Sequence, residues 1–125
     1  MESAPSLVQL VKDISARFPI DAQLIAARIE ELGYEPDAFT AWFEQFSQRT
    51  TEAIRNGDET LARGHLALMS QHMETADKIV MEYIDVYYVE SLMWNLDDKK
   101  KKWGWSLIPN NLRKLYVAMW GEPSF

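Results

Sequence analysis

The residues best suited to chemistry in this sequence are two histidines, His65 and His72, the only ones in the chain. Seven residues apart on a predicted helix, they share a face but lie roughly 10.5 Å apart along its axis. That separation is too large for one metal ion, because the His-Glu-x-x-His motif places its histidines four residues apart. The chain has no cysteine, which excludes disulfides and thiolate-bound zinc. We therefore expect no metal, no cofactor and two semi-buried or surface histidines, and no serine stands out as a nucleophile.

A single carboxylate, Glu90, falls on the apolar face of a helix predicted over residues 76–96. The same face carries Tyr83, Val86, Tyr87 and Trp94. A buried charge without a partner costs several kcal/mol, so three interpretations of Glu90 stay open. It pairs internally with Arg113, with Lys114 or with an aromatic polar group; it faces a partner from a groove; or it is an acid/base catalyst. We expect the internal pair.

Other acidic side chains extend along and beyond the same helix: Glu82, Asp85, Asp97 and Asp98. Glu44 and Glu52 do the same on the helix predicted over residues 37–56. Such residues usually form a solvated face. If they gather on one side of the fold, they form a patch suited to a basic protein.

A basic run, Lys99–Lys102, leads directly into Trp103 and Trp105. Lysines with aromatic neighbours can bind single-stranded nucleic acid, but these are confined to one segment, and a net charge of −6 repels phosphates. We expect a loop over residues 97–105 in which both tryptophans point to one side and hold the last helix on the core. Contact with a protein partner through one tryptophan is the alternative.

Apolar residues recur at helical spacing through most of the chain, and glycine and proline sit at the boundaries. Asp21 and Asp58 are predicted N-caps, and Gly33 is a predicted C-cap. We expect an all-α fold: a single domain over residues 1–125, built as an irregular bundle of about six helices with antiparallel helix pairs. The predicted helices cover residues 6–17, 21–32, 37–56, 59–73, 76–96 and 112–120.

The N-terminal segment has an acid, Glu2, and no basic stretch before an apolar block, which predicts no signal peptide. No run of about 18 apolar residues is present to span a membrane. We therefore expect a cytoplasmic protein that binds neither membranes nor nucleic acid.

The C-terminal seventy residues contain three segments, "IRNGDE", "YIDVYYVESLMWNL" and "WGWSLIPNNLRKLY". Their order and content resemble those of small all-helical immunity proteins from bacterial polymorphic-toxin systems of the contact-dependent or type VI/Rhs-like kind. The matching positions are Gly57, Asp58, Val86, Tyr88, Val89, Glu90, Leu92, Trp105, Leu107, Pro109, Leu112 and Arg113.

The resemblance implies a protein that is not an enzyme and that neutralises a cognate toxin domain by stoichiometric binding, commonly through an acidic surface. The predicted contact residues are Glu82, Asp85, Asp97, Asp98 and Trp103. A helical adaptor or regulatory subunit unrelated to toxins is the alternative function. An enzyme that uses Glu90 as an acid/base group is a third.

Overall fold

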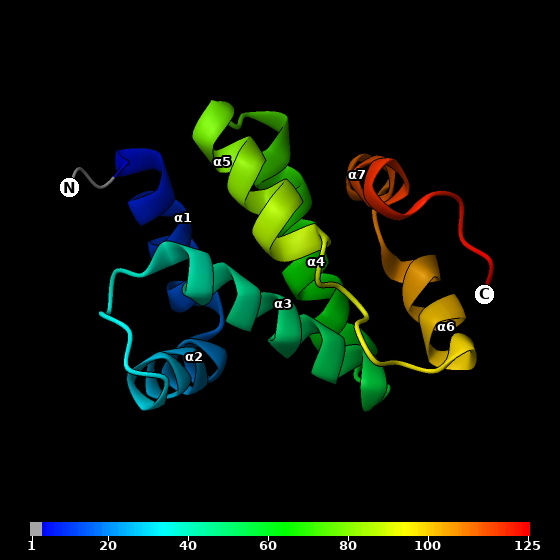
Figure 1. Cartoon of the computed structure of the whole chain (residues 1–125), viewed down its shortest axis with the longest axis horizontal. Helices are drawn as coiled ribbons and strands as arrows, with labels where there is room; N and C mark the ends of the chain where they lie inside the picture. The colour runs from blue at the N-terminus through cyan, green and yellow to red at the C-terminus, as the bar shows by residue number, and fades with distance from the viewer. Residues whose placement is uncertain (1–3) are drawn as a thin grey trace.

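Seven α-helices and one π-helical segment make up the computed structural model, which describes residues 4–125 (Figure 1). No strand occurs in this range, so the predicted all-α class is confirmed. The segment around Glu2 lies outside the described residues. The elements are α1 (Pro5–Arg17), α2 (Pro19–Glu31), α3 (Phe39–Arg55), α4 (Glu59–Glu74), α5 (Lys78–Glu82), η1 (Tyr83–Val89, the π-helical segment), α6 (Asp98–Leu107) and α7 (Asn110–Trp120).

Helix α3 is central, with α1 and α2 on one side of the molecule and α6 and α7 on the other (Figure 1). It packs against α2, α4, α6 and η1. Its apolar residues follow the helical period, so one continuous stripe of the helix is buried. The buried apolar members are Trp42, Phe43, Phe46, Ala53 and Ile54.

The turn between α3 and α4 is confirmed as predicted from the sequence. Gly57 has φ +70°, the left-handed conformation that a residue with a side chain adopts at a cost. The Asp58 side chain accepts a hydrogen bond of 3.1 Å from the Leu61 N–H, which caps α4.

Helix α2 begins at Pro19, before the N-cap that was predicted at Asp21. Phe18 alone separates α1 from α2, and Pro19 is the first helical residue, where its missing N–H costs nothing. Asp21 is therefore not an N-cap. It lies in the first turn with its side chain buried, which leaves its carboxylate free to bond across the core.

The prediction of one long helix over residues 76–96 is wrong beyond Val89, where the helical conformation ends. Asp77, not Thr75, caps its first part through a 2.9 Å bond from the Val80 N–H. A π-helical segment then follows, and residues 90–95 form turns in which Met93 and Asn95 have φ of 63° and 66°. The chain thus leaves the helix beside α3.

The loop predicted over residues 97–105 is instead the first part of helix α6. Asp97 caps it by accepting a 2.8 Å bond from the Lys100 N–H. In a helix, residues two apart diverge by about 200°, so Trp103 and Trp105 do not share a side. Gly104 between them is buried, and a Cβ there would lie 2.9 Å from the Ile54 side chain of α3. Lys99–Lys102 therefore belong to the first turns of α6, and Gly104 allows this helix to pack closely on α3.

Within residues 4–125, no helix is both long enough and apolar enough to cross a membrane.

Candidate functional site

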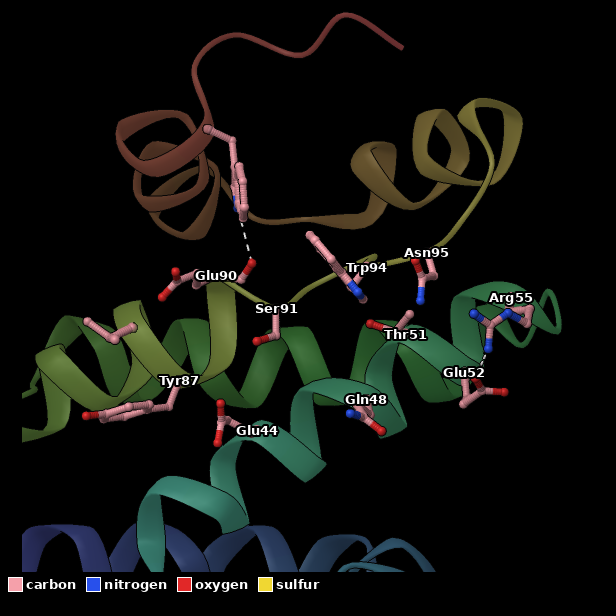
Figure 2. A pocket seen from close by; sticks show the side chains of 12 residues that line it. Glu44, Gln48, Thr51, Glu52, Arg55, Tyr87, Glu90, Ser91, Trp94 and Asn95 are labelled. Atoms are coloured by element: carbon pink, nitrogen blue, oxygen red, sulfur yellow. Dashed lines mark hydrogen bonds and ion pairs between the residues drawn. The ribbon is translucent and has the colours of Figure 1, made fainter.

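A groove of about 610 Å³ lies between helix α3 and the segment that runs from η1 to Asn95 (Figure 2). This volume falls in the range of ordinary ligand pockets. Helix α3 contributes Glu44, Gln48, Thr51, Glu52 and Arg55. The opposite side consists of Val86, Tyr87, Glu90, Ser91, Trp94 and Asn95, and Trp120 of α7 completes the lining.

The α3 wall follows from helical geometry. Positions 44, 48, 51, 52 and 55 recur at intervals of three and four, so they lie in one row on the helix. The row is polar, and the apolar stripe of α3 points elsewhere into the core. The amphipathic pattern that folds α3 thereby also presents one polar face to the groove.

The other wall depends on two departures from α-helical backbone. In η1 a backbone N–H donates to the carbonyl five residues earlier, instead of four as in an α-helix. The Glu90 N–H, for example, donates a 3.1 Å bond to the Asp85 carbonyl. Met93 and Asn95 then adopt left-handed conformations, which cost about 1 kcal/mol or more for a residue with a side chain. Trp94 lies between them and projects into the groove (Figure 2).

Buried hydroxyl groups of α3 hold this unusual backbone in place. Ser47 Oγ donates a 2.6 Å bond to the Tyr88 carbonyl at the end of η1. Thr51 Oγ1 accepts a 2.9 Å bond from the Met93 N–H. These bonds satisfy backbone groups that a continuous α-helix would have paired internally, so α3 specifies where the long helix stops.

Two tryptophans at the groove are strongly exposed for residues of their size. The exposed fraction is 62% for Trp94 and 49% for Trp120, and their ring centroids lie 6.3 Å apart. The Trp120 indole N–H donates a 3.1 Å bond to the Glu90 carbonyl, which fastens α7 to this wall. Exposed tryptophans in a concave site are typical of surfaces that bind a partner.

The groove carries an excess of negative charge. Glu52 is paired with Arg55, three residues later on α3. Glu44 and Glu90 form no ion pair with any residue from 4 to 125. Two glutamates of the lining therefore have no ion-pair partner in the described part of the chain.

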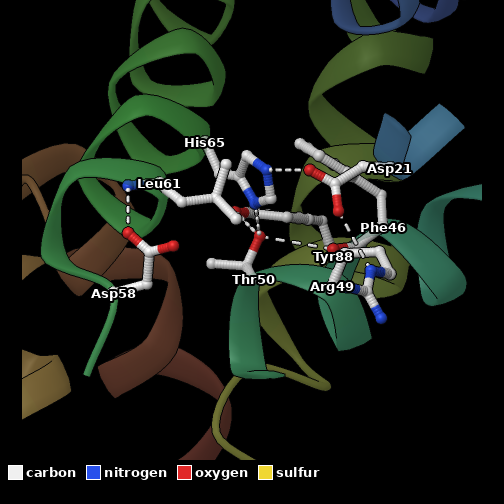
Figure 3. Close-up of polar contacts among 8 residues, drawn as sticks. All are labelled: Asp21, Phe46, Arg49, Thr50, Asp58, Leu61, His65 and Tyr88. Carbon is white, nitrogen blue, oxygen red and sulfur yellow. Dashed lines mark hydrogen bonds and ion pairs between the residues drawn. The ribbon is translucent and has the colours of Figure 1, made fainter. Parts of the chain in front are cut away.

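A second polar cluster, the buried centre, joins α2, α3, α4 and η1 (Figure 3). His65 Nδ1 lies 2.9 Å from Thr50 Oγ1, and Thr50 Oγ1 lies 2.9 Å from the Tyr88 hydroxyl. His65 Nε2 lies 2.9 Å from Asp21 Oδ2, and Arg49 donates a 3.0 Å bond to Asp21 Oδ1. Each of these polar groups has a partner.

The partners set the direction of the hydrogen bonds. A carboxylate only accepts, so the hydrogen of neutral His65 is on Nε2 and Nδ1 accepts from Thr50. Thr50 in turn accepts from the Tyr88 hydroxyl. Burial lowers the pKa of His65 below its ordinary value, against the opposing effect of Asp21, and burial raises the pKa of Tyr88. The buried centre therefore holds a neutral histidine.

A hydroxyl, a histidine and an aspartate in series also describe a hydrolytic triad. Here Thr50 and His65 are fully buried, so no substrate reaches the hydroxyl. The arrangement is a structural network. The sequence offered no way to single it out, because its members come from four separate elements.

Glu90 does not form the internal pair that we expected. Glu90 is a half-buried residue that lines the groove, and its carboxylate forms no ion pair among residues 4–125. Arg113, the expected partner, donates a 2.9 Å bond to the Trp105 carbonyl and lies 5.2 Å above the Trp105 ring. Lys114 is exposed. The groove position matches the partner-facing alternative for Glu90.

None of the five predicted contact residues lines the groove. Glu82 is exposed at the end of α5, and Asp85 of η1 is half-buried with its pKa raised by burial. Asp97 and Asp98 are exposed at the start of α6, and Trp103 is half-buried against the core. The two acidic pairs lie in separate parts of the molecule, α5 at the top and the start of α6 at the lower right of Figure 1. Their role in binding stays a prediction.

Sequence reasoning missed Trp120 and gave Trp94 only a place on an apolar face. It did raise the possibility that Glu44 and Glu52 gather on one side with other acids. The signal for Trp120 is its position at the end of a helix, directly before Gly121. A large apolar side chain in the last turn of a helix can lie beyond the buried stripe that packs on the core.

The chain belongs to the family described as a domain of unknown function, DUF7674, whose model matches residues 11–121. No curated protein and no solved structure matches the chain. The family description names no activity or partner, so the resemblance to immunity proteins stays a prediction.

Proposed function

We propose that this protein acts by binding a basic protein partner in the groove. The observation that carries the proposal is the combination of Glu44 and Glu90, which lack ion-pair partners among the described residues, with the exposed Trp94 and Trp120 beside them. Opposite charge speeds the approach of a partner and selects for it, and a covered tryptophan contributes affinity.

The partner that we propose is a bacterial toxin domain, which the protein neutralises by stoichiometric binding in the cytoplasm. The C-terminal resemblance to polymorphic-toxin immunity proteins supports this choice. The groove supports it independently, because toxins that act on nucleic acids or other anionic substrates present basic surfaces.

The test is a growth experiment. The C-terminal domain encoded by the gene directly upstream is expressed inducibly in a bacterium, with and without this protein. We expect the domain to stop growth, the protein to restore it, and the two to co-purify in a fixed ratio. A domain that kills in the presence of the protein, or a harmless one, would contradict the toxin partner and favour an adaptor role.

The Glu44→Gln/Glu90→Gln variant shows whether rescue depends on the groove. A matched control is Glu74→Gln, which removes an exposed charge at the end of α4, outside the groove. We expect the control to restore growth like the wild type, and the double variant to restore it poorly.

A further inference from the structure

We infer that the groove takes an arginine side chain, presented by a short segment of the partner, between the tryptophans and the unpaired carboxylates. This inference rests on the proposed function and specifies the chemistry that the groove recognises. Its first basis is the composition of the lining, which combines aromatic faces with carboxylate oxygens.

A guanidinium group matches both features. It is planar, so it stacks on an indole ring, and it donates hydrogen bonds in pairs to a carboxylate. The Trp94 and Trp120 rings are tilted against each other, with an interplanar angle of 35°. Glu90 and Glu44 supply the carboxylates, one from each wall of the groove.

The same chain already contains one such contact. Arg113 lies 5.2 Å from the centroid of the Trp105 ring, in the position of a cation–π interaction. Among residues 4–125, no cation occupies the corresponding position over Trp94 or Trp120. Lys101 lines a small recess beside these tryptophans but forms no ion pair with Glu90. The groove tryptophans are thus open to an external cation.

A protein segment suits the groove better than a small free cation. The volume of about 610 Å³ exceeds the needs of one side chain. A small cation would leave most of the exposed Trp94 and Trp120 surfaces in water, whereas a segment of two or three residues would cover them. We therefore assign the occupant as a peptide segment that contains arginine.

The experiment uses a capped triarginine peptide as the probe, with capped tricitrulline as its uncharged control of similar shape. Two-dimensional NMR of the full chain follows the tryptophan indole N–H signals during the titration. We expect the Trp94 and Trp120 signals to shift with triarginine and hardly at all with tricitrulline. The signal of Trp42, which is buried in the core, should stay in place.

Substitutions test the two features separately. We expect Glu90→Gln and Trp94→Ala each to weaken triarginine binding about tenfold, and Glu74→Gln to leave it unchanged. Absence of shifts at millimolar peptide, equal shifts with tricitrulline, or affinity that ignores both groove substitutions would overturn the inference.

The outcome is separable from that of the proposed function. If triarginine binds as expected but the upstream domain is not neutralised, the toxin partner is wrong and the arginine site stands. If the domain is neutralised equally well by Glu90→Gln and Trp94→Ala, the immunity function stands and the arginine site is wrong.

Discussion

The buried centre and the groove contain similar kinds of side chains but differ in how these are paired and exposed. Each combines carboxylates with aromatic rings and threonine hydroxyls, and each has α3 as one wall. In the buried centre every polar group is paired and His65 is inaccessible to solvent. In the groove two carboxylates lack ion-pair partners among the described residues, and two tryptophans are exposed. The comparison indicates that the buried centre stabilises the fold and the groove is available for binding.

The largest effect on stability should come from His65→Ala. The substitution removes one of the two side-chain partners of Asp21, takes the His65 acceptor away from Thr50, and removes the ring that packs against Phe18 and Phe46, at centroid distances of 4.5 and 4.7 Å. We expect the free energy of unfolding to fall by about 3 kcal/mol. Urea unfolding followed by circular dichroism measures it.

His72→Ala is the matched control. His72 is partly exposed and contacts Asp13 at 3.1 Å, so we expect a loss of less than about 1 kcal/mol. Equal losses for the two histidines would mean that the buried centre is not a stabilising network.

A somewhat smaller loss of stability should follow Gly104→Ala, a substitution in the buried part of α6. A Cβ at this position would lie 2.8 Å from Met93 Sδ and 2.9 Å from Ile54 Cγ2. We expect a loss of about 2 kcal/mol, because the packing of α6 against α3 must open. Thermal unfolding measures it, and an unchanged melting temperature would show that α6 is not held this closely.

Thr51→Val tests the hydroxyl that joins α3 to the left-handed turn. The side chains have similar shapes, but the Met93 N–H loses its 2.9 Å acceptor. We expect a loss of about 1 kcal/mol in the free energy of unfolding and weaker triarginine binding, because the wall that carries Trp94 loosens. Thr60→Val, an exposed threonine on α4, is the control. A Thr51→Val variant with wild-type stability and affinity would contradict this role.

The pKa of His65 predicts that the stability of the protein depends on pH. This pKa is lowered in the folded state, so the unfolded chain binds a proton more readily. The stabilising contribution is therefore complete above the unfolded pKa of about 6.5 and is lost as pH falls toward the folded pKa.

Between pH 7.5 and 6 we expect the unfolding free energy to fall by at most about 1 kcal/mol, and His65→Gln to flatten this slope. Urea unfolding at several pH values measures both. Stability that increases as pH falls through this interval would mean that the folded state favours charged His65.

The smallest effect on stability should be that of Trp94→Ala. Its side chain is 62% exposed, so little burial is lost, and we expect a change below about 0.5 kcal/mol. Binding, in contrast, should weaken strongly. A large loss of stability would mean that Trp94 serves the fold as the buried centre does.

The sequence predicted most of the helices because their apolar stripes are local. The boundaries of α1, α3, α4 and α7 agree with the pattern to within a few residues. It failed at residues 90–95 because the acceptors and donors that end the helix, Ser47 and Thr51, lie more than forty residues earlier in the chain. It failed at α6 because lysines and a glycine suggested a loop, although Asp97 caps a helix there.

The groove was predictable only in part, for the same reason. Glu90 stood out because a carboxylate on an apolar face requires an explanation. Its neighbours Glu44 and Trp120 come from distant parts of the chain, and only the tertiary structure brings them together. The buried centre was hidden in the same way, since its four elements meet only in the folded chain.

The most direct test of the division between the two regions is a binding measurement on the purified upstream toxin domain. Isothermal titration calorimetry compares the wild type with Glu44→Gln/Glu90→Gln, and thermal unfolding is recorded for both proteins. We predict that the dissociation constant rises at least about tenfold, with the melting temperature unchanged. An unchanged dissociation constant would contradict the assignment of the groove as the binding surface.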